Sequence, residues 1–104
     1  MGATNFHDSI DGYDSADWVS AISAYKRLVE ESIYECGNDP YNGTISTTSG
    51  IEYLGEIDKN NLYQFIEEHT DNYDKWGKCG CVSTKVGEEP NARYTFHFFG
   101  WVAI

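Results

Sequence analysis

The sequence predicts a single α+β domain over residues 1–104, an antiparallel sheet of about four strands with one long and one short helix packed on one face. Three observations favour this class. The first half contains an amphipathic helical pattern of about 22 residues. Segments rich in β-branched and aromatic residues dominate the second half. The chain of 104 residues is long enough for one hydrophobic core but not for two.

The first predicted elements are a short strand and the long helix. The strand is expected over residues 3–6. Asp14 or Ser15 is expected to cap the helix, with Asp17 in its first turn, where the helix dipole favours negative charge. Residues 37–40 contain glycine, asparagine and proline and are typical of a helix end. Apolar residues recur at helical spacing along one stripe of this helix: Trp18, Ile22, Tyr25, Val29, Ile33 and Cys36.

The remaining elements alternate between strands and a short helix. That helix is expected to have Asp58, Asn60 or Asn61 as its cap and a short apolar face of Leu62, Phe65, Ile66 and His69. In the last strand, Phe98 and Phe99 have opposite parity, so Gly100 is expected at a bulge that switches the inward face. The predicted strands are residues 44–48, residues 51–54, Cys79–Val86 and Arg93–Ala103.

Charge and aromatic content limit the classes of partner. Seventeen acidic and seven basic residues give a net charge of −10, and 15% of the residues are aromatic. Such aromatic content is typical of a folded chain and not of a disordered acidic tail. The negative charge disfavours direct binding to nucleic acid or to an anionic membrane, since both require clustered Lys and Arg.

The compartment is expected to be the cytoplasm. The sequence contains no apolar run of 18 residues, and its first residues lack the basic and apolar regions of a signal peptide. Three cysteines are an odd number and too few for a disulfide scaffold, which agrees with a reducing compartment.

The acidic residues are unevenly distributed. Residues 1–58 contain 11 acidic and 2 basic residues, a net charge of −9, whereas residues 59–104 contain 6 and 5, a net charge of −1. Carboxylates spaced along a rigid helix can imitate phosphates and occupy a basic groove of a partner. The structural alternative is a solvated acidic face without a partner. The candidate partner-binding carboxylates are Asp8, Asp11, Asp14, Asp17, Glu30, Glu31 and Glu35.

A second candidate site is the polar segment over residues 41–50. If it forms an edge strand, it is open to strand addition by a partner, and Asn42, Thr44 and Thr47 are the expected contact residues. The alternative is ordinary turn and strand chemistry. Trp76 lies in a predicted loop and is a further candidate contact, because aromatic residues often anchor interfaces; the alternative is a place in the core.

Metal and catalytic sites have weaker support. Cys79 and Cys81 share one face of a strand and, with Cys36 and either His97 or His69, would supply thiolate and imidazole ligands for zinc. The spacing is unusual for zinc, so small buried apolar residues are favoured. His7 beside Asp8, or His97 with a carboxylate, would suit acid–base chemistry, but the sequence shows no phosphate-binding loop or nucleophile motif. We expect no metal, no cofactor and no catalysis.

Four segments resemble small proteins encoded by phages and prophages. They are the start MGATNF, the central ECGNDPYNGTISTT, then DKWG, and FFGW near the end. The match extends over most of the chain. The resemblance implies a phage origin and carries over no catalytic residue. Small acidic phage proteins often inhibit host defence, with anti-CRISPR proteins as an example, so an inhibitory function follows by analogy only.

The leading hypothesis is a phage-encoded inhibitor in the host cytoplasm. It would bind a basic, nucleic-acid-binding host protein, such as a CRISPR effector or another defence enzyme, through its acidic surface and block it sterically. The alternative is a small accessory or antitoxin-like module that pairs through the Thr-rich edge strand. Either a monomer or a homodimer is compatible with the sequence.

Overall fold

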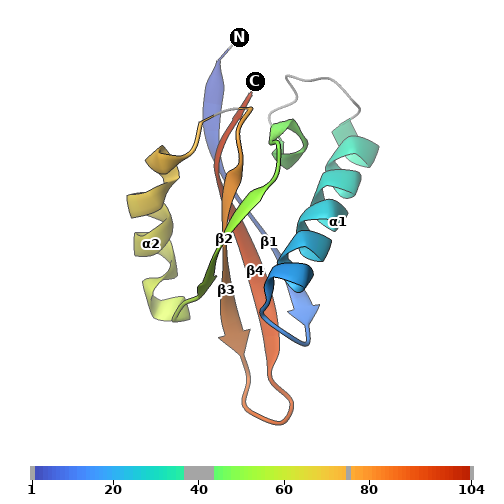
Figure 1. Cartoon of the computed structure of the whole chain (residues 1–104), viewed down its shortest axis with the longest axis vertical. Coiled ribbons are helices and arrows are strands. Elements are labelled where there is room, and N and C mark those ends of the chain that lie inside the picture. The colour runs from blue at the N-terminus through green and yellow to red at the C-terminus, as the bar shows by residue number, and fades with distance from the viewer. Residues whose placement is uncertain (1, 37–43, 75, 104) are drawn as a thin grey trace.

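In the described part of the chain, four strands form one sheet with the order β1-β4-β3-β2. The computed structural model describes residues 2–36, 44–74 and 76–103. β4 lies in the middle and pairs antiparallel with both β1 and β3, whereas β2 pairs parallel with β3 (Figure 1). The strands are β1 (Ala3–Tyr13), β2 (Ile51–Glu56), β3 (Cys79–Val86) and β4 (Arg93–Ala103).

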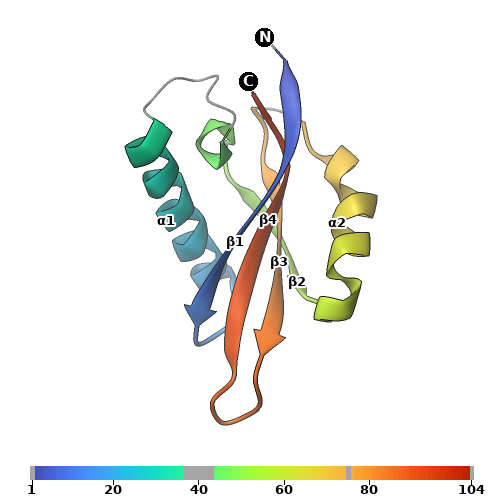
Figure 2. The same cartoon turned by 180° about the vertical axis from the view of Figure 1, so that it is seen from behind.

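The α-helices of the described residues, α1 (Trp18–Cys36) and α2 (Leu62–His69), lie on opposite sides of the sheet (Figures 1 and 2). The predicted α+β class is confirmed, as are four mostly antiparallel strands with one long and one shorter helix. The predicted placement of both helices on one face is wrong, because α1 and α2 cover opposite faces of the sheet. The sheet therefore has a core on each side, whereas the sequence predicted a single core. One contains Phe96 and Phe98 beneath α1, and the other contains Phe99 and Val82 beneath α2.

The parallel pairing of β2 and β3 follows from the segment that connects them. A 3-10 turn (Lys59–Asn61), α2 and a second turn (Thr70–Asn72) return the chain to the end of the sheet where β2 began. A crossover of this length permits a parallel neighbour, which a tight hairpin does not. The sheet is therefore mixed, and not purely antiparallel as the sequence predicted.

The aromatic residues of β4 alternate between the two cores. Phe96 and Phe98 face α1, whereas His97 and Phe99 face the α2 side. The pairing of β1 with β4 runs without a register shift from Ala3 to Ile10, so the bulge predicted at Gly100 is wrong. A bulge was predicted because large apolar residues occur at both even and odd positions of this strand. They do so because both faces of the strand are buried and both require apolar side chains.

α1 begins one residue after its capping side chain. The backbone N–H of Ser20 donates to Oδ1 of Asp17 at 2.8 Å, so Asp17 is the cap, in place of the predicted Asp14 or Ser15. Ala21 and Ala24 are fully buried, whereas Trp18 at the edge of the predicted stripe is 52% exposed. The small alanine side chains let the helix backbone approach the sheet closely. The predicted C-terminal cap, residues 37–40, lies outside the described residues.

The predicted strand over residues 44–48 is wrong, because Ile45–Thr47 is a 3-10 helix. Hydroxyl groups hold this turn. Oγ1 of Thr47 donates to the carbonyl of Thr44 at 3.0 Å and accepts from the N–H of Ala103 at 3.2 Å. Side chains that compete for backbone hydrogen bonds favour turns over strands, which explains the difference from a prediction based on β-propensity. A Thr-rich edge for strand addition is therefore not present here.

Replacing Thr47 with Val is expected to destabilise the protein. Val has nearly the same shape, but it leaves the buried N–H of Ala103 without its acceptor, which costs about 1–3 kcal/mol. The measurement is the free energy of unfolding by chemical denaturation. Thr47→Ser retains the hydroxyl and serves as the control, so equal losses for the two variants would contradict the assigned hydrogen bond.

Candidate functional site

The candidate carboxylates do not form one continuous face, because Asp14 and Asp17 have structural partners and Asp8 is half-buried. Asp14 forms an ion pair with Arg93. Asp17 caps α1, and the hydrogen bond from the Ser20 N–H lowers the pKa of its carboxyl group. Asp8 projects from β1 on the same side as Phe6 and Ile10, toward α1, and burial raises the pKa of its carboxyl group. Asp8 is therefore a poor contact for a large partner.

The carboxylates of the second half of α1 do lie together. Glu30, Glu31 and Glu35 line one surface hollow of about 390 Å³ with Arg27 and Tyr34. All five side chains are exposed, and Tyr34 is 92% exposed. We call Arg27, Glu30, Glu31, Tyr34 and Glu35 the α1 acidic surface. It carries three negative charges and one positive charge on a single rigid helix.

Arg27 neutralises this surface only weakly. Its Nε lies 3.8 Å from Oε1 of Glu31, and both side chains are more than half exposed. Exposed pairs with this spacing contribute little to stability, since water screens the attraction. Arg27 is therefore free to exchange Glu31 for another partner, and Glu30 and Glu35 lie beside it on the same helix.

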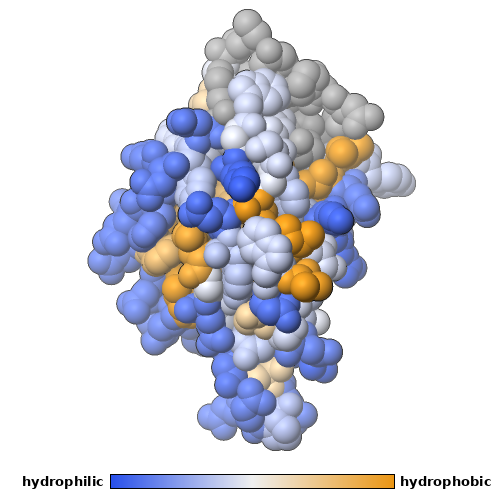
Figure 3. All heavy atoms as spheres, viewed as in Figure 1, coloured by the Kyte–Doolittle hydropathy of each residue, from blue (hydrophilic) through white to orange (hydrophobic). Residues whose placement is uncertain are grey.

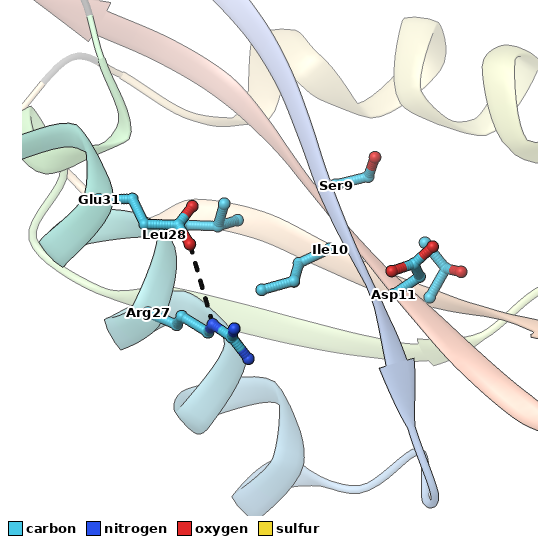
Figure 4. Close-up of a pocket in the computed structure, with 7 residues that line it drawn as sticks. Ser9, Ile10, Asp11, Arg27, Leu28 and Glu31 are labelled. Carbon is cyan, nitrogen blue, oxygen red and sulfur yellow. Dashed lines mark ion pairs between the residues drawn. The ribbon is translucent and has the colours of Figure 1, made fainter. Parts of the chain in front are cut away.

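A shallow groove of about 330 Å³ extends from the α1 acidic surface toward β1 (Figure 4). Figure 4 shows Ile10 directed from β1 toward α1, whereas Asp11 projects from the other side of the strand. Asp11 and Glu31 thus border the same groove from two elements. Asp11 lines this groove, but its side chain projects away from α1, so it does not extend the α1 acidic surface.

Tyr34 is a surface residue that the sequence reasoning missed. It does not belong to the apolar stripe of α1, and an aromatic residue outside that stripe is expected to be solvent-exposed. The position of Tyr34 outside the stripe was therefore the sequence signal that could have identified it as a surface residue. An exposed tyrosine offers a flat apolar area and a hydroxyl group at low entropic cost, which is why interfaces are enriched in this residue.

The other candidate contacts are dispersed. Asn42 lies outside the described residues. Thr47 is buried in the turn beside β4, and its hydroxyl donates a hydrogen bond to the carbonyl of Thr44. Trp76 is 43% exposed and has a φ of 70°, in the left-handed region. These residues are not part of the α1 acidic surface.

Cys79 and Cys81 share one face of β3, as predicted, and both are fully buried in the core beneath α1. Burial raises the pKa of Cys79 to about 12 and also raises that of Cys81, so both thiols stay protonated at neutral pH. His97 lies on the opposite face of the sheet. Among the described residues, no three His, Cys, Asp or Glu side chains are grouped as metal ligands.

The histidines that were candidates for acid–base chemistry contact each other. Nε2 of His7 lies 3.3 Å from Nδ1 of His97, and Nε2 of His97 lies 3.0 Å from Oγ1 of Thr84. Burial, and then the charge of His7, lower the pKa of His97 to about 4. Burial also lowers the pKa of His7, although Asp8 partly opposes this effect. Both rings are therefore neutral at pH 7, and the arrangement joins β1 to β4 and β3.

Hydrophilic residues cover α2 and the connection between β3 and β4, while hydrophobic residues on the visible face gather in smaller groups between the helices (Figure 3). No helix within the described ranges has both the length and the apolar character needed to cross a membrane. The chain matches no family model, no curated protein and no solved structure.

Proposed function

We propose that this protein is an inhibitor that binds a basic protein through the α1 acidic surface and blocks it sterically, without chemistry of its own. The observation that carries the proposal is the nearly fully exposed ring of Tyr34 among three glutamates on one rigid helix. The ring supplies apolar contact area, and the carboxylates supply charge complementarity to Lys and Arg of the partner.

The proposed partner is a nucleic-acid-binding defence protein of a bacterial host, such as a CRISPR effector. Its groove for nucleic acid is positively charged, and the carboxylates of the α1 acidic surface compete with phosphates for that groove. The net charge of −10 favours rapid association, because long-range attraction steers the two proteins together. The segments that resemble phage proteins support this class of partner and a site of action in the host cytoplasm.

Neutralising the α1 acidic surface is expected to weaken binding. The test uses a purified CRISPR effector loaded with its guide RNA, and it measures both direct binding and the inhibition of target-DNA binding. Glu30→Gln/Glu35→Gln removes two charges and leaves the Arg27–Glu31 pair intact. We expect about a tenfold loss of affinity, which corresponds to about 1.4 kcal/mol. Tyr34→Ala is expected to weaken binding at any salt concentration, since its contact is apolar.

A matched control separates local from general electrostatics. Glu56→Gln/Glu88→Gln also removes two charges, but from β2 and from the connection between β3 and β4. This variant is expected to bind nearly as the unmodified protein does. Equal weakening by both double variants, or no salt-dependent complex with basic nucleic-acid enzymes, would argue against the α1 acidic surface as the docking site.

A further inference from the structure

A second groove lies on the other side of the sheet, between β1 and α2. Its volume is about 510 Å³, and its wall on the α2 side continues into the turn Thr70–Asn72. It does not share a residue with the α1 acidic surface. The residues that line it are Asn5, Phe6, His7, Tyr63, Ile66, Glu67, Thr70 and Asp71.

One wall of this groove is an exposed aromatic ring. Tyr63 is 75% exposed, although it lies on the helix face that borders the groove. Its ring meets His7 edge to face, with 6.1 Å between the ring centroids and 83° between the ring planes. His7 is itself held by the contact with His97 at 3.3 Å. The aromatic wall is therefore positioned by β1 and not by α2 alone.

The other walls combine an apolar base with negative charge. Ile66 is 9% exposed and supplies apolar surface. Glu67 and Asp71 are both exposed and stand four residues apart, close to one helical turn. None of the described lining residues is Lys or Arg, and burial lowers the pKa of His7, so its imidazole is neutral at pH 7. The groove therefore has a net negative charge.

We propose that this groove binds an arginine side chain presented by a partner protein. Arginine matches each wall: its aliphatic stem packs on Ile66, its guanidinium plane stacks on the ring of Tyr63, and its N–H groups donate to Glu67 and Asp71. Lysine fits less well, because an ammonium group neither stacks nor forms bidentate hydrogen bonds. The site is independent of the α1 acidic surface and places a second cation contact on the opposite side of the sheet.

The test is a titration of the full chain with N-acetyl-argininamide, followed by two-dimensional NMR. We expect saturable shifts that centre on His7, Tyr63 and Ile66, with smaller shifts for N-acetyl-lysinamide and none for the uncharged N-acetyl-norleucinamide. Glu67→Gln/Asp71→Asn is expected to weaken argininamide binding about tenfold, since it removes two charge-assisted acceptors. Tyr63→Leu is expected to reduce the preference for arginine over lysine.

The control is Glu56→Gln/Glu88→Gln, which makes the same change in net charge outside both this groove and the α1 acidic surface and is expected to leave argininamide binding unchanged. Three results would overturn the proposal: no saturable shifts, shifts centred on α1, or equal weakening by both double variants. The outcome is separate from that of the proposed function, because the effector assay can succeed or fail without any change at this groove.

Discussion

Replacing Gly80 with Ala is expected to destabilise the protein by about 3 kcal/mol or more, as overpacking of a close contact does at its upper range. Gly80 lies on β3 beneath the aromatic rings of the core on the α2 side. A Cβ at this position would overlap the ring of Phe99 and would lie 2.9 Å from Cε2 of Tyr73. The two rings pack edge to face, with 5.8 Å between centroids, and neither can withdraw without opening this core.

The measurement is the free energy of unfolding, determined by chemical denaturation, and the expected decrease is large. A chain of 104 residues is expected to have an unfolding free energy of about 5–15 kcal/mol, so this loss removes a substantial share. Phe99→Leu removes the ring atoms that a Cβ would overlap. In the double variant the two losses are therefore expected to be less than additive, by about 1 kcal/mol or more. Additive losses would show that Gly80 is not constrained by Phe99.

Acidification from pH 7 to pH 4 is expected to lower the unfolding free energy by up to about 3 kcal/mol through His97. His97 is 8% exposed, and its pKa is about 4 in the folded protein against 6.5 for an unperturbed histidine. Between these values the unfolded state binds the proton and the folded state does not. Stability therefore decreases as the pH falls through this window and levels off below pH 4.

The groups around His97 determine the size of this effect. His7 on β1 is a hydrogen-bonding partner, and the two imidazoles would repel each other if both carried a proton. Thr84 on β3 holds the other ring nitrogen, and it does not titrate. Asp8, whose pKa is raised by burial, contributes with the opposite sign, because protonating it is easier in the folded state. The measurement must therefore isolate His97 from the carboxylates.

The control is His97→Gln, which retains a polar group toward Thr84 and cannot acquire the proton. Unfolding free energies of both proteins are measured at a series of pH values, and the difference between them is the contribution of His97. This difference is expected to change between pH 6.5 and pH 4 and to be constant above pH 7. Parallel pH profiles for the two proteins would contradict the assignment.

Local sequence was sufficient for several elements. The strands Cys79–Val86 and Arg93–Ala103 have the predicted bounds, because β-branched and aromatic residues persist over their whole length. The spacing of apolar residues also predicted α1 correctly. The strand β1 is longer than the predicted residues 3–6, since its later residues are polar, and pairing with β4 extends it to Tyr13.

The candidate site was predicted in part. The sequence identified Glu30, Glu31 and Glu35, which share the α1 acidic surface, because neighbours on one helix face follow from helical spacing. It grouped Asp14 and Asp17 with them, but an ion pair with Arg93 and a helix cap engage these side chains. Such partners are not visible in a charge count.

The sequence by itself determined the α+β class, the long helix, the two central strands and the surplus of negative charge. Only the tertiary structure decided that the helices lie on opposite faces, that Phe99 and Phe98 belong to different cores, and that His7 and His97, 90 residues apart, are in contact. The physical reason is the separation along the chain of the residues that interact. Local patterns reflect the propensity of a segment and which of its faces is apolar, whereas the choice of neighbour depends on contacts between distant segments that form only as the chain packs.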